Sequence, residues 1–142
     1  MRINDILRHK GTSVATIGPD ATVAELLSTL SEQRVGALVV SSDGARVEGI
    51  VSERDVVRRL HESGADLLSA PIATIMTAEV HTCSPEDSID ALMRMMTERR
   101  IRHIPVVVAD RLTGIVSIGD VVKFRIDELE AESKQLQDYI AG

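Results

Sequence analysis

The sequence predicts an α/β fold of the α+β type, built from two pseudo-symmetric β-α-β-β-α repeats packed face to face. Three observations lead to this prediction: an internal repeat, apolar periods that alternate between helix and strand spacing, and a length of 142 residues. That length suits one compact domain or two very small ones. A single copy of about 60 residues buries too little surface to be stable alone, so we expect the copies to pack together.

The internal repeat is visible in two pairs of segments. Residues 49–57 (GIVSERDVV) match residues 114–122 (GIVSIGDVV) at seven of nine positions. Residues 16–20 (TIGPD) match residues 82–86 (TCSPE) in the same order along the chain. The offset between copies falls from 66 in the upstream pair to 65 in the downstream pair. The second copy has therefore lost one residue, and we place the loss in the loop between its paired strands.

Helix signals follow the first short strand of each copy. Thr22 and Glu25 form a T-x-x-E capping box, and Ser88 is expected to cap the matching helix of the second copy. Apolar residues then recur at helical spacing, which predicts one buried face on each helix. These residues are Val23, Leu26, Leu27 and Leu30 in the first copy and Ile89, Leu92, Met93 and Met96 in the second.

Two strands and a closing helix complete each copy. Continuous apolar runs are typical of strands buried on both faces, and aspartate at a turn between such runs favours a hairpin. The expected segments are the runs 35–40 and 101–108, the turns Asp43-Gly44 and Asp110-Arg111, the returning strands 47–51 and 112–116, and helices opened by Ser52 and Ser117.

The chain is expected to divide into three parts. We predict a first repeat with its leader at residues 1–63, a second repeat with its leader at 64–125, and a C-terminal helical extension at 126–142. Within the connector, residues 72–76 (IATIM) parallel residues 3–7 (INDIL). Each copy is therefore expected to own a short leader that forms a helical turn.

The extension carries a stripe of apolar or small residues at alternating steps of four and three, the spacing of a coiled-coil seam. The stripe comprises Val122, Ile126, Leu129, Ser133, Leu136 and Ile140. Two interpretations stay open at this point. The stripe packs either against another chain or back on its own domain.

Composition excludes several function classes. The net charge of −6, the pI of about 5.2 and an aromatic content of 1% argue against a nucleic-acid partner, which favours basic and stacking surfaces. The longest uncharged stretch, residues 67–78, is too short to span a bilayer, and residues 1–5 lack the apolar core of a signal peptide. The single cysteine, Cys83, fits a reducing compartment. We therefore expect a cytoplasmic protein with no membrane partner.

The unit G-I-V-S-x-x-D-V-V, which follows a strand and opens a helix, resembles the cystathionine β-synthase (CBS) domain. The tandem copy, the element order and residues 102–106 (RHIPV) agree with it from Met1 to about Arg125. The resemblance implies a stand-alone CBS pair, or Bateman module, that binds adenosine-containing ligands such as AMP, ADP, ATP or NAD between its copies. It further implies a homodimer that passes ligand occupancy to an unknown regulated protein.

The repeated Ser-x-x-Asp unit suits such a ligand chemically. Ser52 and Asp55, like Ser117 and Asp120, lie one helical turn apart and share a face. A carboxylate there can accept from both ribose hydroxyls, while a hydroxyl and free amides at a helix start suit phosphate. The same pattern also caps helices locally. Both functions stay open for these residues, and serine is able to perform both.

By analogy with the family, each cleft combines the Ser and Asp of one copy with the strand entrance of the other. The first cleft would hold Ile50, Ser52, Arg54, Asp55, Met76, His81, Ile101, Arg102 and His103. The second would hold Lys10, Ala15, Gly36, Ala37, Ile115, Ser117, Gly119 and Asp120. Because guanidinium groups favour phosphate, we expect the first cleft to be the better phosphate site, although Arg54 can equally be a solvated helix residue and Arg102 a surface ion pair.

Catalysis is not expected. The sequence has no G-x-S-x-G or Walker A motif, and His81-x-Cys83 supplies only two of the three or four ligands of a zinc site. The leading hypothesis is a non-catalytic regulatory module without a catalytic cofactor or metal. The alternative is a constitutive protein-interaction scaffold with vestigial ligand clefts, and a nucleotide hydrolase has no support in the sequence.

Overall fold

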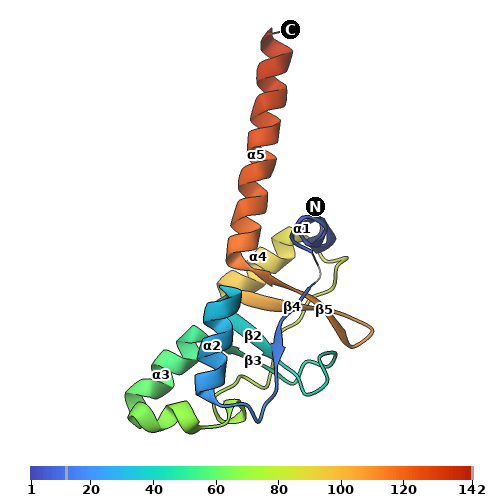
Figure 1. Cartoon of the computed structure of the whole chain (residues 1–142). Helices are drawn as coiled ribbons and strands as arrows, with labels where there is room; N and C mark the ends of the chain where they lie inside the picture. Colours follow the sequence, from blue (N-terminus) through green and yellow to red (C-terminus); the bar gives the residue numbers. More distant parts are fainter. Residues whose placement is uncertain (12, 142) are drawn as a thin grey trace.

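A computed structural model gives the structure of the chain and describes residues 1–11 and 13–141. The expected parts 1–63 and 126–142 include Thr12 and Gly142, which lie outside the described residues. The first repeat comprises β1 (Thr16–Ile17), α2 (Val23–Gln33), β2 (Ala37–Val40), β3 (Gly49–Ser52) and α3 (Glu53–Ser63). The second comprises α4 (Ile89–Arg99), β4 (His103–Val108), β5 (Arg111–Ser117) and α5 (Ile118–Ala141) (Figure 1). The leaders are α1 (Ile3–Lys10) and two short 3-10 helices, η1 (Gly64–Ser69) and η2 (Ile72–Thr74).

The two repeats have matching strand arrangements, which confirms the predicted mixed α+β fold. In the first, β1 runs parallel to β2, and β2 pairs with β3 in antiparallel fashion. In the second, β4 pairs with antiparallel β5, while the expected first strand is reduced to one parallel bridge between Cys83 and Val106. The difference in length between the copies lies in the connection between the paired strands, as predicted. A loop joins β2 to β3, whereas β4 and β5 meet at a tight turn.

The predicted helix caps are present, and one turn is shifted. Thr22 and Glu25 form the reciprocal capping box at the start of α2, and the Ser88 hydroxyl accepts from the Ala91 amide at 3.0 Å. The tight turn is centred on Ala109-Asp110 rather than Asp110-Arg111, and both central residues have positive φ angles of 50° and 62°. Such a pair matches the twist of a two-residue hairpin.

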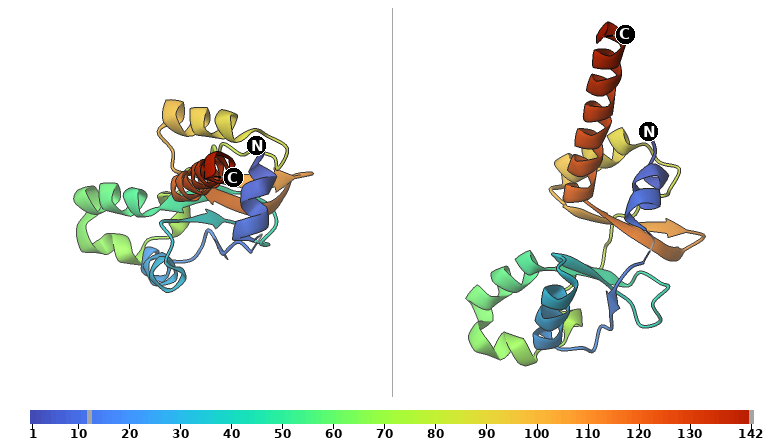
Figure 2. Two further views of the ribbon diagram at one scale, coloured as in Figure 1. Left: turned by 90° about the horizontal axis from the view of Figure 1, so that it is seen from above. Right: turned by 45° about the horizontal axis from the view of Figure 1, so that its top comes forward.

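Two apolar cores lie in separate lobes, and the leaders are exchanged between them (Figure 2). Ile3, Ile6 and Leu7 of α1 are buried in the core of the second repeat, and the Ile3 amide donates to the Asp87 carbonyl at 2.9 Å. Ile72 and Ile75 of the connector are buried in the core of the first repeat. The expected boundaries stay predictions, but the packing shows that each leader closes the other repeat's core.

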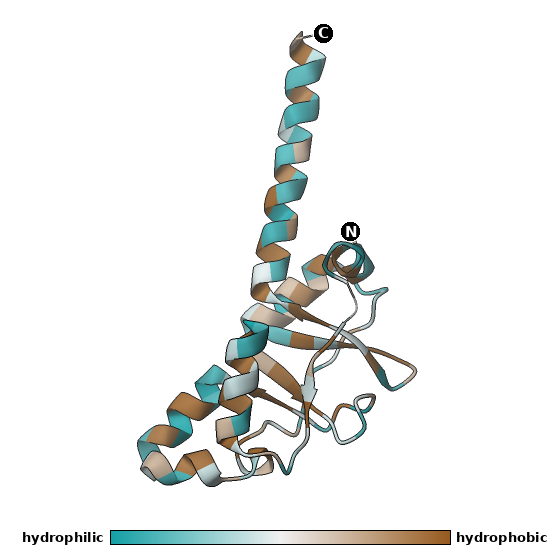
Figure 3. Ribbon diagram, viewed as in Figure 1, coloured by the Kyte–Doolittle hydropathy of each residue, from teal (hydrophilic) through white to brown (hydrophobic). Residues whose placement is uncertain are grey.

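Helix α5 continues the closing helix of the second repeat without a break, as predicted. Figures 1 and 3 show it projecting well away from the body. Leu129 and Leu136 are each 61% exposed, and Ile140 is 76% exposed. The interpretation that the apolar stripe packs back on its own domain is therefore wrong. Among the helices of the described ranges, none has the length and apolar character needed to cross a membrane.

Candidate functional site

The two Ser-x-x-Asp units form equivalent capped helix starts. At α3, the Asp55 carboxylate accepts from the Ser52 amide at 2.8 Å, and the Ser52 hydroxyl accepts from the Asp55 amide at 3.4 Å. At α5, Asp120 and Ser117 make the same two bonds at 2.8 and 3.1 Å. The local capping interpretation is therefore correct for both units. Capping does not exclude ligand binding, because a carboxylate oxygen has further lone pairs to offer.

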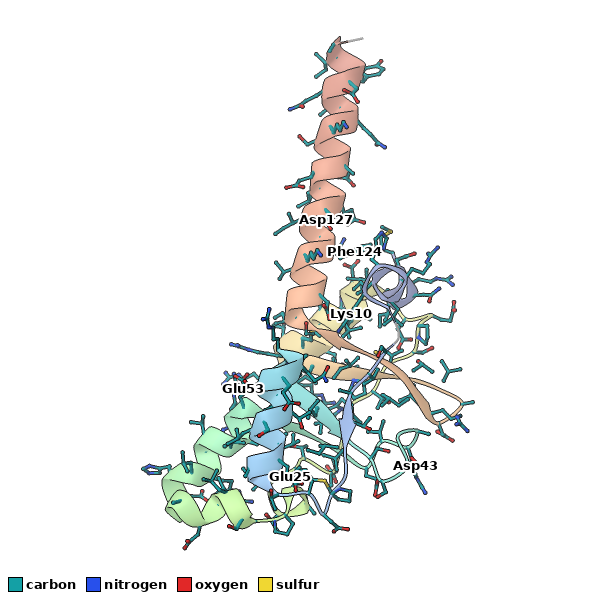
Figure 4. The ribbon with its side chains drawn as sticks, in the orientation of Figure 1. Lys10, Glu25, Asp43, Glu53, Phe124 and Asp127 are labelled. Atoms are coloured by element: carbon teal, nitrogen blue, oxygen red, sulfur yellow. The ribbon has the colours of Figure 1, made fainter. Side chains whose placement is uncertain are left out.

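Lys10 distinguishes the second unit from the first. Its Nζ donates to Asp120 Oδ2 at 2.6 Å and to the Ile115 carbonyl at 2.7 Å. The side chains of Lys10 and Asp120 are 32% and 23% exposed, so the ion pair is shielded from most of the solvent. It ties the end of α1 to the first turn of α5, where Figure 4 shows Lys10 and Phe124. Among the described residues, no cation is paired with Asp55 at the equivalent place.

The pKa of Asp120 is set by opposing effects. Partial burial raises the pKa of this carboxyl, but hydrogen bonds from Lys10 and from the Ser117 amide outweigh burial. The pKa therefore lies below the usual value, and the side chain is an anion at neutral pH. An anionic carboxylate that already faces a cation has the chemistry to accept from a diol while the lysine contacts a phosphate.

His103 lies between the two groups: Lys10 and Asp120 of the second group act on its charge, and so does Glu53, which follows Ser52 of the first. It pairs with Ser117 across β4 and β5, and a Cβ placed on Gly36 would lie 3.5 Å from its Cε1 atom. Burial lowers the pKa of His103, and the nearby charge of Lys10 lowers it further. Strand pairing explains its position beside the second group, because a residue that enters β4 lies beside the end of β5 in its own repeat.

The second group is brought together only in part. Gly36 and Ala37 lie beside the first capped turn, because the Glu53 amide donates to the Gly36 carbonyl at 3.0 Å and Ala37 pairs with Ser52. His103 joins Lys10 and Asp120 on one side to Gly36 of the first repeat on the other. The Arg102 carbonyl accepts from the Ile118 amide at 2.8 Å, which places the strand entrance at the start of α5. Gly119 is exposed beside Ser117 in the first turn of that helix. Ala15 is partly buried and Ala37 is buried, and both lie in the first repeat.

The first group is assembled only in part. The amides of Ile50 and Thr77 each donate to the other residue's carbonyl, at 3.0 and 2.9 Å, which brings the preceding Met76 beside β3. Ala37 lies opposite Ser52 across the strands. Arg54 and His81 are exposed, and Ile101 is partly buried against the core of the second repeat. The expected phosphate preference of the first cleft rested on Arg54 and Arg102, and this basis is weakened because the Arg102 backbone lies at the start of α5.

A groove opens beside the second group, between α1 and the base of α5. Its volume is about 510 Å³, and Lys10 and Asp120 are among the residues that line it. The remaining lining residues are Met1, Ile6, His9, Lys123, Phe124, Asp127, Glu128, Ala131, Glu132 and Gln135. The sequence did not indicate this groove, and only the family analogy had placed Lys10 and Asp120 in the same cleft. Lys10 and Asp120 are 110 positions apart, and no local pattern connects them.

The half metal site at His81 and Cys83 gains no further ligands in the described ranges, where no cluster of three metal-ligating side chains occurs. Burial raises the pKa of the Cys83 thiol to about 12, and Asp87 adds to the effect. A thiol with that pKa stays protonated at neutral pH, and a thiolate is the form that binds metal.

Comparison with known proteins places these features in one family. The sequence profile of the CBS domain matches the chain twice, over residues 3–62 and 72–127. A relative from Arabidopsis thaliana, the CBS domain-containing protein CBSX3, mitochondrial, is 36% identical over 148 residues. The aligned part covers 99% of this chain and 72% of that relative.

Solved structures agree with the sequence comparison. The CBS-domain containing protein ATU1752 from Agrobacterium tumefaciens is 43% identical, with a TM-score of 0.85 over 88% of this chain and 99% of that one. The CBS domain pair of protein MJ0100, solved with 5′-methylthioadenosine and S-adenosyl-L-methionine, shares the fold at a TM-score of 0.78 and 22% identity. That alignment covers 87% of this chain and 98% of the other. With two matched copies, exchanged leaders and a capped Ser-x-x-Asp turn in each, this chain belongs to the CBS domain family as a tandem CBS pair.

Proposed function

We propose that this chain is a non-catalytic sensor that binds an adenosine-containing ligand, such as AMP, ADP, ATP or NAD, between its two repeats. The observation that carries the proposal is the meeting of Lys10 and His103 with the capped turn of Ser117 and Asp120, while Gly36 of the first repeat lies beside the His103 ring. The MJ0100 pair supports the choice of ligand class, because both molecules named in its complex contain adenosine.

The second site offers a role for each group. Asp120 accepts from the ribose hydroxyls, as acidic residues do in dinucleotide-binding folds. The ligand must take over part of the carboxylate from Lys10, whose Nζ lies 2.6 Å away. The released ammonium then pairs with a ligand phosphate, so neither charge is left uncompensated. We therefore propose the second site, rather than the first, as the one that prefers phosphate-bearing ligands.

The first site suits a less charged ligand. Asp55 has its capping bonds from Ser52 and no ion pair among the described contacts, so binding displaces no lysine. The apolar side chains of Ile50 and Met76 lie together beside this turn and can cover an adenine ring. Arg54 is exposed on α3 and remains a candidate for a phosphate contact there.

We further propose that the chain works as a homodimer and passes ligand occupancy to a partner protein. Helix α5 supports this, because it carries Asp120 at its start and exposed apolar residues along its length. A cytoplasmic location remains part of the proposal, and the Arabidopsis relative is named as mitochondrial.

One observation favours the second candidate function, a constitutive scaffold with vestigial clefts. Lys10 satisfies Asp120 within the chain itself, which is the arrangement expected of a cleft that no longer receives a ligand. In that case the ion pair is purely structural, and a ligand panel distinguishes the two functions.

The test is a thermal-melt panel of adenosine, AMP, ADP, ATP, NAD and S-adenosyl-L-methionine, with GMP and GTP as matched controls. A ligand that binds only the folded chain adds about 2.7 kcal/mol of stability at a hundredfold excess over its Kd. We expect adenosine compounds to raise the melting temperature and guanosine compounds to leave it unchanged. If no adenosine compound acts at millimolar concentration, the sensor function is refuted and the scaffold is favoured.

A further inference from the structure

The exposed stripe on α5 has the features of an interface with one particular partner. Val122 and Ile126 are 51% and 50% exposed, although they lie close to the body, and exposure rises to 61% at Leu129 and Leu136. The body meets a different side of the helix, where Val121 is buried and Phe124 is partly buried against the core of the second repeat. The apolar stripe is thus left uncovered along its full length.

The heptad positions of the stripe favour two strands. Val122, Leu129 and Leu136 occupy d, while Ile126, Ser133 and Ile140 occupy a. Isoleucine at a with leucine at d is the combination that favours a parallel two-stranded coil. We propose that α5 pairs with α5 of a second copy of this chain as a short, parallel, in-register coiled coil, which deepens the homodimer of the proposed function.

The charges beside the stripe distinguish the two possible directions. In the parallel register, a g residue faces the e residue five positions later in the partner. Arg125, which also pairs with Asp90 and Glu128 of its own chain, then faces Glu130, and Glu132 faces Gln137. The antiparallel register that brings all six layers into contact places Glu130 opposite Glu130 and Glu132 opposite Glu132. Like charges at such positions repel, so the charge pattern favours the parallel direction.

Ser133 gives an independent argument for direction and register. In the parallel coil its hydroxyl faces the hydroxyl of the other Ser133 across the seam, where the two can form a hydrogen bond. In the antiparallel coil it faces Leu129, which leaves a polar group against an apolar one. A single polar residue at an a position is a known device for setting register, because an unpaired hydroxyl in an apolar layer is unfavourable.

The test uses cysteine cross-linking of the full-length chain. Ser133→Cys places a thiol at the seam, and Asp138→Cys places one at an f position on the opposite face as the matched control. The native Cys83 is buried and does not interfere. Under mild copper-phenanthroline oxidation, we expect Ser133→Cys to form a disulfide-linked dimer and Asp138→Cys to remain a monomer on denaturing gels. Mixed Ser133→Cys and Leu129→Cys chains provide the test for the opposite direction. If this mixture cross-links and Ser133→Cys alone does not, the coil is antiparallel and the proposal is overturned.

Sedimentation of a second variant separates this proposal from the ligand-binding function. Leu129→Glu combined with Leu136→Glu leaves the single chain intact, because both side chains are mostly exposed. We expect the dimer dissociation constant to rise at least about 100-fold, while the response to adenosine compounds persists. A dimer that survives these substitutions, or a wild-type monomer, refutes the seam and leaves the sensor function standing. Cross-linking without any ligand response refutes the sensor and leaves the seam.

Discussion

Asp55 and Asp120 occupy equivalent helix starts but differ in one partner, and this difference predicts unequal effects of one substitution. Each carboxylate accepts from the amide of its own serine at 2.8 Å. Asp120 also accepts from Lys10 at 2.6 Å. Asparagine keeps one carbonyl acceptor and can still cap a helix. Asp55→Asn should therefore be nearly neutral without ligand, whereas Asp120→Asn loses the charge that holds Lys10.

The size of the effect follows from the exposure of the pair. Ion pairs on the surface contribute about 0.2–1 kcal/mol, and hydrogen bonds to charged groups contribute about 1.5–3 kcal/mol. The Lys10–Asp120 pair, with side chains 32% and 23% exposed, lies between these cases. We expect Asp120→Asn to lower the free energy of unfolding by about 1 kcal/mol more than Asp55→Asn, or roughly 3–5 °C in melting temperature.

The pH dependence has a definite sign. The pKa of Asp120 is lowered in the folded chain, so its contribution to stability is complete above the unfolded pKa of about 3.9 and is lost as the pH falls through the native pKa. Lys10→Gln should raise the native pKa of Asp120. The stability advantage of the wild type over Lys10→Gln should therefore persist from neutral pH to about pH 4 and shrink below it.

Urea unfolding of ligand-free protein measures these quantities. The variants are Asp55→Asn, Asp120→Asn, Lys10→Gln and the double variant of Lys10 and Asp120, each at pH 7 and at steps down to pH 3. A double-mutant cycle then isolates the coupling between the two side chains. Equal losses for the two Asp→Asn variants, together with a coupling below about 0.3 kcal/mol, would refute the assignment of a stabilising ion pair at the second site.

Three further predictions follow from individual residues. The pKa of about 12 for Cys83 predicts that a thiol reagent at pH 8 labels the native chain at least about 1000-fold more slowly than the urea-unfolded chain, and equal rates would contradict the burial. Gly49→Ala should cost about 1–3 kcal/mol in urea unfolding, because the new Cβ would lie 2.6 Å from a methionine sulfur and 3.0 Å from a backbone carbonyl oxygen. Gly18→Ala, with nothing within 4 Å, is the control that should stay within about 0.5 kcal/mol. NMR titration should give His103 a pKa below 6.5 that rises in Lys10→Gln, and an unchanged value would exclude Lys10 from its surroundings.

The sequence alone determined the features that depend on neighbouring residues. The capping box at Thr22, the cap at Ser88 and the capped turns at Ser52 and Ser117 could all be predicted. Each rests on bonds between residues three positions apart, so the local chain contains all the information. The repeat itself predicted the fold class, because two copies of one pattern fold into two copies of one unit. Strand ends were less accurate, since the returning strand of the first copy begins at Gly49 rather than residue 47.

Only the tertiary structure decided how distant segments meet. The burial of α1 in the core of the second repeat, the ion pair of Lys10 with Asp120 and the placement of His103 beside Gly36 each join residues 67 or more positions apart. Nothing in a local pattern chooses between the two repeats, because their cores offer similar apolar surfaces to either leader. The choice depends on how the two lobes pack and on which cation that packing brings to each carboxylate. The apolar stripe of α5 also depends on both sources of information. Its heptad spacing could be seen in the sequence, but only the structure shows that the rest of the chain leaves the stripe exposed.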